Sequence, residues 1–176
     1  MVSINEMLAD GTYDAVTTQQ ASHFSGMPDT YALLPELIGW VRDAQPLAKV
    51  YLQETWAYEI DSTHGAFPQY HSDQRYMYEC LRDAYRNAAK EVDAALIPSG
   101  DVVQYFREHV TRYDYAHGGL SLNRDGFHLS IPYGRYLNSA VWFETLLGGD
   151  IRGNAFVPDG VQDVALLAEI QNEVHN

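Results

Sequence analysis

The feature that most constrains this chain is a regular alternation of short strand-like and longer helix-like segments. The strand-like segments are rich in β-branched or apolar residues and cover 14–19, 48–53 and 93–97. Between them lie helical patterns at 29–43 and 70–90, with apolar residues spaced three and four apart. Strands separated by helices pair in parallel, because each crossover returns the chain to the same end of the sheet. The sequence therefore predicts a three-layer α/β/α fold with a short, mostly parallel sheet.

The rest of the chain adds helices and no second domain. We find no internal repeat, low-complexity tract or linker, so residues 1–176 read as one domain. Ser3 and Glu6 have the spacing of a capping box at the start of the first helix. The further helices are expected at 3–9, about 101–110, 131–147 and 161–174.

Composition excludes several classes of partner and site. The net charge of −13 repels phosphate backbones, so nucleic acid is not expected as a partner. No apolar run approaches the ~20 residues that cross a bilayer, and no membrane partner is expected. With a single cysteine, Cys80, the chain forms no internal disulfide. The chain as given reads as cytoplasmic, although a longer, secreted parent protein with a leader is left open. The glycines form no nucleotide-binding motif and the histidines no zinc spacing, so no cofactor and no metal are expected.

The strongest chemical signal is Asp125-Gly126-Phe127-His128, just before the helix expected at 131–147. A histidine accepts a proton from a hydroxyl nucleophile, and an aspartate fixes its tautomer and stabilises the imidazolium. The alternative is structural, with Asp125-Gly126 forming a turn and His128 packing at the start of the helix. Spacing alone does not decide between them.

Several segments together resemble the SGNH (GDSL-type) hydrolases, in particular a bacterial branch labelled a domain of unknown function. The resemblance implies a flavodoxin-like topology and an esterase or deacetylase that removes acyl groups from a carbohydrate or a similar small ester. It assigns the general base to His128 and its orienting carboxylate to Asp125. The segments that carry it span roughly 13–147 and are 14–22, 53–58, 97–100, 125–130 and 134–136.

The resemblance is incomplete at its first block, where the family has a strand ending in Gly-Asp-Ser or Gly-Asn-Ser. That serine is the family's nucleophile, and its block is expected before Met1, so we expect an N-terminally truncated fold. In the family the nucleophile strand lies beside the strand that corresponds to 14–19. We therefore expect an unpaired edge there, covered by the N-terminal helix, by a partner chain or by a second copy in a homodimer.

Two polar residues follow the first strand. The resemblance places Ser22 where the family has an oxyanion donor, and the Gln20 amide is a second candidate for that role. Ser22 has two other interpretations: a loop hydroxyl bonded to its own backbone, or a substitute nucleophile. All three remain open at this point.

The long loop after the second strand supplies candidate substrate-binding residues. Trp56 and Tyr58 follow a strand end and are expected to wall a pocket, although packing beneath the loop explains them equally well. His23 and His64 are expected near the same pocket, with plain surface histidines as the alternative.

Three functions remain. The first is an SGNH-type esterase whose nucleophilic serine lies outside this chain, acting on a small ester or glycan. The second is a catalytically inactive module that binds a carbohydrate or protein and dimerises through the sheet edge. The third is an unrelated small α/β enzyme, in which Asp125 and His128 would lie apart.

Overall fold

The structure is a computed structural model that describes residues 2–176. Its three strands form one parallel sheet in the order β1-β2-β3, as the alternating pattern predicts. The strands are β1 (Ala15–Thr18), β2 (Lys49–Gln53) and β3 (Ala95–Ile97). The helices are α1 (Ile4–Ala9), α2 (Leu34–Ala44), α3 (Gln74–Glu91), α4 (Ser99–His109), α5 (Tyr133–Leu147) and α6 (Val164–His175), with short 3₁₀ turns at Pro28–Tyr31, Phe67–Tyr70, Thr111–Tyr113 and Tyr115–His117.

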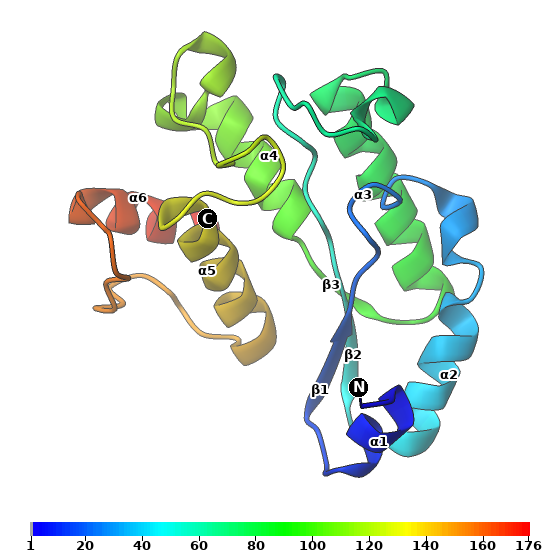
Figure 1. The fold of residues 1–176 in the computed structure, drawn as a ribbon. Helices are drawn as coiled ribbons and strands as arrows, with labels where there is room; N and C mark the ends of the chain where they lie inside the picture. The colour runs from blue at the N-terminus through cyan, green and yellow to red at the C-terminus, as the bar shows by residue number, and fades with distance from the viewer. Residues whose placement is uncertain (1) are drawn as a thin grey trace.

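Helices cover both faces of the sheet, which confirms the three-layer architecture (Figure 1). Strand β2 is central and buried on both faces. Its Val50 and Leu52 side chains pack in one core with α2 and α3, whereas Tyr51 packs in another with α4, α5 and α6. This alternation is the period of two that a strand imposes on its side chains.

Two predicted helices begin later than expected. The helix predicted from Tyr70 is wrong at its start, because Tyr70 ends a separate 3₁₀ turn and α3 begins at Gln74. The Asp73 side chain caps α3 by accepting a hydrogen bond from the Tyr76 N–H at 2.9 Å. Between the two elements His71 and Ser72 have positive φ, which an α-helix does not accommodate.

The helix predicted at 29–43 is likewise divided. A 3₁₀ turn at Pro28–Tyr31 precedes α2, and Pro35 lies in the first turn of α2 rather than in its interior. A proline is tolerated there, since the first N–H groups of a helix have no intrahelical partner. Elsewhere, including the capping box of Ser3 and Glu6, the predicted elements are confirmed with ends shifted by at most three residues.

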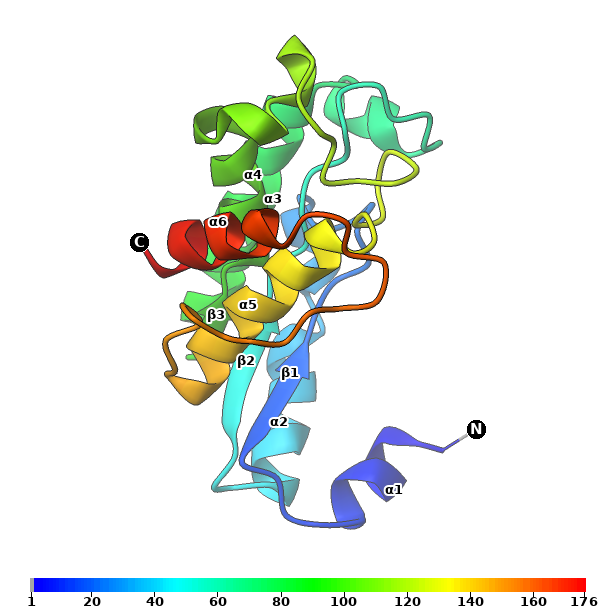
Figure 2. The same cartoon turned by 90° about the vertical axis from the view of Figure 1, so that its left-hand side faces the viewer.

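Strand β1 is an edge strand, and within residues 2–176 nothing pairs with its outer side. Figure 2 shows α1 at the lower end of the molecule, away from that edge. Helix α1 instead docks near the end of α2, where the Gln45 side-chain amide donates to the carbonyl oxygens of Leu8 and Gly11. The N-terminal helix, one of the three expected covers, therefore does not cover the β1 edge in this structure.

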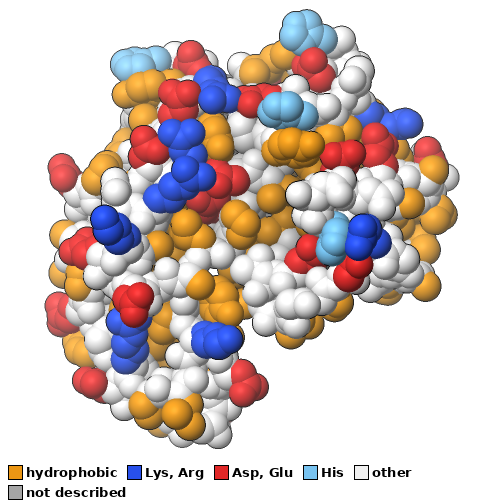
Figure 3. Space-filling view, turned by 180° about the vertical axis from the view of Figure 1, so that it is seen from behind, with side chains coloured by type: hydrophobic (Ala, Val, Ile, Leu, Met, Phe, Trp, Pro, Cys, Tyr) orange, Lys and Arg blue, Asp and Glu red, His pale blue; other side chains and the backbone are white. Residues whose placement is uncertain are grey.

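The surface carries charges of both signs. On the face seen in Figure 3, Lys and Arg side chains lie among Asp and Glu side chains, and most of the visible histidines lie toward the upper end. In the part of the chain that is described, none of the helices combines the length and apolar character needed to cross a membrane.

Candidate active site

Three loops meet at the end of the sheet toward which the strands run (Figure 1). They follow β1, follow β2 and precede α5. The loops after β1 and β2 are joined by the Thr55 hydroxyl, which donates to the buried Ser25 hydroxyl at 2.6 Å. Open α/β sheets bind ligands at this end of their strands, so the predicted location of the site agrees with the architecture.

Asp125 and His128 form the hydrogen-bonded pair that the catalytic interpretation requires. The Nδ1 atom of His128 lies 2.8 Å from Oδ2 of Asp125, and the backbone N–H of His128 donates to Oδ1 at 2.8 Å. These hydrogen bonds from His128 lower the pKa of Asp125 to about 2, so its carboxyl is ionised at neutral pH. Gly126 makes the turn possible, since its φ is +86° and a Cβ there would lie 3.0 Å from the Ser62 Cα.

The second imidazole nitrogen is free to react. Among the hydrogen bonds of residues 2–176, none involves Nε2 of His128. The His128 side chain is 55% exposed. In this histidine a carboxylate holds Nδ1, and Nε2 is open at the rim, the end of the sheet toward which the strands run. This is the arrangement of a general base without the nucleophile hydroxyl that it would activate.

A second pair of the same spacing shows what distinguishes this one. Asp114 and His117 are also three residues apart, with Nδ1 of His117 2.8 Å from an Asp114 oxygen. The His117 side chain is 83% exposed and lies at the end of the 3₁₀ turn Tyr115–His117. Pairing alone is thus a property of the spacing. The lower exposure of His128 and its contact with the Phe127 ring distinguish Asp125–His128 from the second pair.

Ser22 contacts Tyr58 rather than its own backbone. The two hydroxyls lie 3.0 Å apart, and the Tyr58 side chain is fully buried. Burial raises the pKa of Tyr58, so Tyr58 keeps its proton and is a potential donor to Ser22. Ser22 then has its own hydrogen available for a second partner.

The predicted pocket histidines form an aromatic cluster beside the pair. The ring of His64 lies 4.6 Å from that of Tyr58 and 4.8 Å from that of Phe127, and His23 stacks on His64 at 6.5 Å. Phe127 lies 4.1 Å from His128, so it joins the cluster to the pair. Nothing in the sequence pattern singles out Phe127 beyond its place between Asp125 and His128.

Trp56 supports the pair from beneath. Its indole Nε1 donates to the carbonyl oxygen of Phe127 at 2.7 Å, and the half-buried ring packs against the core beneath α4 and α5. The described cavities do not include Trp56 in their lining, and the contact that the structure shows for it holds the loop of His128.

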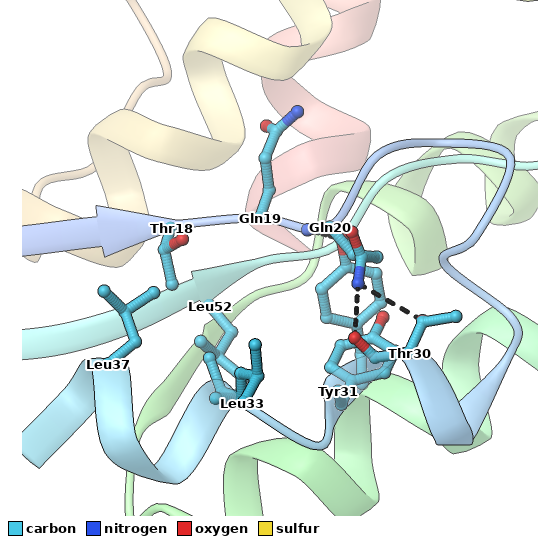
Figure 4. Close-up of a pocket in the computed structure, with 10 residues that line it drawn as sticks. Thr18, Gln19, Gln20, Thr30, Tyr31, Leu33, Leu37 and Leu52 are labelled. Atoms are coloured by element: carbon cyan, nitrogen blue, oxygen red, sulfur yellow. Dashed lines mark hydrogen bonds between the residues drawn. The ribbon is translucent and has the colours of Figure 1, made fainter.

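The Gln20 amide is bonded to Thr30 and not to any other candidate site residue in residues 2–176. Its side-chain amide donates to the Thr30 carbonyl oxygen at 2.9 Å and to the Thr30 hydroxyl at 3.2 Å. Figure 4 shows this amide directed toward Thr30 and α2, in a groove also lined by Leu33 and Leu37, whereas Gln19 points to the opposite side. To act on an oxyanion, the Gln20 amide would first have to leave Thr30.

A buried ion pair beneath the loops is absent from the sequence-based predictions. Arg107 of α4 and Glu59 of the loop after β2 lie 3.7 Å apart, and both side chains are at most 4% exposed. Arg107 also donates to Asn123 and to the Ala57 carbonyl, while the Glu59 N–H donates to the Gly126 carbonyl at 2.7 Å. The burial of Arg107 could have been inferred from the sequence, because Arg107 follows Phe106 and lies on the apolar side of its helix.

In the described residues, one group of potential metal ligands comes together: Glu144, Asp150 and His175. The His175 Nδ1 lies 2.9 Å from Glu144 and 3.4 Å from Asp150, which ties the end of α6 to the end of α5. Arg152 forms an ion pair with Asp150 at 2.7 Å, and the Ile151 N–H donates to Glu144. These protein partners already occupy the carboxylates.

Comparison with solved structures gives the same architecture. A DUF4886 family protein from Bacteroides uniformis is 34% identical over 98% of this chain, with a TM-score of 0.87, and the match covers 65% of that protein. A candidate SGNH hydrolase from Slackia heliotrinireducens is 20% identical over 81% of the chain and 70% of its own length, with a TM-score of 0.57. The chain therefore spans about two thirds of the length of the solved structures it resembles.

The fold is that of the SGNH hydrolases at the level of architecture. A candidate GDSL-like lipase from Parabacteroides merdae is 15% identical over 73% of the chain and 58% of its own, with a TM-score of 0.48. No curated protein matches the sequence. Residues 1–172 match the domain of unknown function DUF4886, and the chain belongs to that family.

Proposed function

We propose that this chain carries the acid–base half of an SGNH-type ester hydrolase. The observation that carries the proposal is the His128 imidazole, which has Nδ1 held by an ionised Asp125 and Nε2 without a hydrogen-bond partner in residues 2–176. In the proposed reaction, Nε2 accepts the proton of a serine hydroxyl as its oxygen attacks the ester carbonyl. The imidazolium then returns that proton to the leaving alcohol, and water releases the acyl group in a second cycle.

The serine is proposed to lie outside residues 2–176. Ser22, the hydroxyl of the loop after β1, bonds to Tyr58 and not to His128. A strand added in parallel beside β1 would end at the same rim as the pair, because parallel strands end together. Such a strand, from another segment or a partner chain, is our proposed source of the nucleophile.

Ser22 is the better placed of the two proposed oxyanion donors. When Tyr58 is the donor in its hydrogen bond with Ser22, the serine hydrogen is free to stabilise a developing negative charge. The substrate proposed is an acylated carbohydrate or a similar small ester, approached past the cluster of His23, His64 and Phe127.

The test is hydrolysis of p-nitrophenyl acetate by the gene product that contains residues 1–176, purified at its natural length. His128→Ala should reduce turnover by at least about a thousandfold. His117→Ala is the matched control, since it removes an imidazole with the same aspartate spacing and should leave turnover unchanged. Equal rates for the wild type and His128→Ala would overturn the proposal.

The open edge of β1 favours the alternative function, an inactive module that dimerises through this edge. Leu33, the N-cap residue of the neighbouring helix α2, and Trp40 within that helix are 75% and 53% exposed. This alternative requires a dimer in solution, with protected β1 amides, glycan binding and no hydrolysis by the natural-length protein. Serine-dependent hydrolysis would exclude it.

A further inference from the structure

A polar cavity is lined in part by Asp125, and its lining contains neither His128 nor Ser22. It measures about 220 Å³ and is formed where the loop after β2 meets residues 115–126. Its lining consists of carboxylates, hydroxyls, an amide and a guanidinium group. Asp61, Thr63, Tyr115, Ser121 and Arg124 contribute side chains, and Asp125 is shared with the proposed catalytic pair.

The buried ion pair gives this cavity a fixed floor. Glu59 lines the cavity and accepts hydrogen bonds from the Ser121 hydroxyl at 2.6 Å and from the Gln74 amide at 2.7 Å. Arg107 lies on its other side, so the charge of Glu59 is balanced within the protein. These hydrogen bonds and the ion pair hold the buried groups in one geometry and preorganise the surface above them.

The upper wall offers hydrogen-bonding groups with unused capacity. Oδ2 of Asp61 accepts from the Tyr115 hydroxyl at 2.8 Å, and Oδ1 has no partner in residues 2–176. Asn123 also lines the cavity, is 6% exposed, and has an Nδ2 donor without a partner in the same residues. A buried amide donor without a partner is costly, which makes Asn123 the least satisfied polar group beneath the cavity.

The charge balance of the wall selects the ligand class. Asp61 and Asp125 are acidic, and Arg124 is the single cationic side chain exposed to the cavity. An anionic ligand would therefore meet net repulsion. A neutral ligand with adjacent hydroxyls matches better, since each hydroxyl both donates to a carboxylate and accepts from an amide or guanidinium.

We infer that this cavity binds the sugar portion of the substrate, with Asp61 and Tyr115 as specificity-determining residues. The inference rests on the proposed function, because sharing Asp125 places the sugar beside the ester that His128 would act upon. The Tyr115 hydroxyl orients the Asp61 carboxylate, and that carboxylate accepts hydrogen bonds from two neighbouring sugar hydroxyls.

The test measures binding and needs no hydrolysis, so it is independent of the source of the nucleophile. Methyl β-D-glucopyranoside, methyl β-D-galactopyranoside and methyl α-D-mannopyranoside are titrated into the ¹⁵N-labelled chain and followed by NMR. At least one should shift the backbone amides of Asp61, Thr63, Ser121 and Arg124 saturably, and glucuronate should bind more weakly. Asp61→Ala should weaken binding about tenfold, the equivalent of one charge-assisted hydrogen bond.

Tyr115→Phe should weaken binding less than Asp61→Ala, since it removes the group that orients the carboxylate and not the carboxylate itself. Tyr105→Phe is the matched control, because Tyr105 also donates to an acid, Glu173 at 3.2 Å, on a different surface. No saturable shift with any glycoside, or shifts that Asp61→Ala leaves unchanged, would overturn the sugar subsite. The dependence of ester hydrolysis on His128 is tested separately by the hydrolysis assay, and a negative binding result would not change it.

Discussion

The indole Nε1 of Trp56 donates a hydrogen bond to the carbonyl oxygen of Phe127 at 2.7 Å. Trp56 follows the central strand by three residues, and Phe127 directly precedes His128. The bond therefore ties the loop of the proposed base to the most buried strand of the sheet. The exposed turn that holds Asp125 and His128 is fixed from below by this contact and by the Glu59–Gly126 backbone hydrogen bond.

We expect Trp56→Phe to destabilise the fold by about 1–3 kcal/mol, because the Phe127 carbonyl loses its half-buried donor. Urea denaturation measures the change. Trp40→Phe serves as the control, since Trp40 is 53% exposed and makes no side-chain hydrogen bond in the described residues, and it should stay within about 0.5 kcal/mol of the wild type. Equal effects of the two substitutions would show that the Trp56 bond does not fix the loop.

Asp125 gives the stability of the protein a defined acid dependence. Its pKa is lowered to about 2 by hydrogen bonds from His128, so its ionised form is favoured in the folded state. That contribution is present above the unfolded-state pKa near 4 and is lost as the pH falls toward about 2. We expect Asp125→Asn to be destabilising at about pH 6 and less so at about pH 3, measured by urea denaturation. Asp43→Asn, at an exposed site on α2, should show no such difference, and a pH-independent effect of Asp125→Asn would contradict the account.

Glu54 gives the opposite dependence at alkaline pH. Burial, followed by the charge of Asp101, raises the pKa of the Glu54 carboxyl to about 8, and its Oε1 has no hydrogen-bond partner within residues 2–176. The neutral form is favoured in the folded state, so stability is lost as the pH rises from the unfolded-state pKa near 4.5 through about 8.

We therefore expect Glu54→Gln to become more stable relative to the wild type between about pH 6 and about pH 9, by on the order of 2–4 kcal/mol. Urea midpoints at the two pH values measure the gain. The exposed Glu91→Gln on α3 is the control. Parallel pH profiles for the wild type and Glu54→Gln would rule out a proton on Glu54.

The buried pair of Arg107 and Glu59 should be strongly coupled. We expect Arg107→Met to cost about 3–5 kcal/mol, because it leaves the Glu59 carboxylate buried without its cation. Adding Glu59→Gln should restore part of that loss, with a coupling free energy above about 1 kcal/mol in a double-mutant cycle. The exposed pair of Arg75 and Glu79 is the reference, with coupling below about 0.5 kcal/mol. Additive effects at Arg107 and Glu59 would mean that the two charges act independently.

The sequence contains the parts of this structure that depend on near neighbours. The alternation of strands and helices, the capping box at Ser3 and the Asp125–His128 pair all follow from residues at most a few positions apart. The same locality explains the errors, since the helix pattern continues through 70–73 and a turn with positive φ at His71 interrupts it.

Contacts between segments that are distant in the sequence could not be predicted from local residue patterns. Ser22 and Tyr58 are 36 positions apart, and Trp56 and Phe127 are 71 apart. Which loop residues meet depends on strand register and loop path, and neither is encoded in a local period. The sequence therefore identified Ser22 as a candidate without identifying Tyr58 as its partner.

The most direct test of the central claim is to locate the adduct of a fluorophosphonate, a reagent that modifies activated serine hydroxyls. The natural-length gene product containing residues 1–176 is treated with the reagent, digested and mapped by mass spectrometry. We expect one modified serine outside residues 2–176, and we expect His128→Ala to abolish the modification while His117→Ala preserves it. Modification of Ser22, or labelling that is unchanged in His128→Ala, would contradict the account.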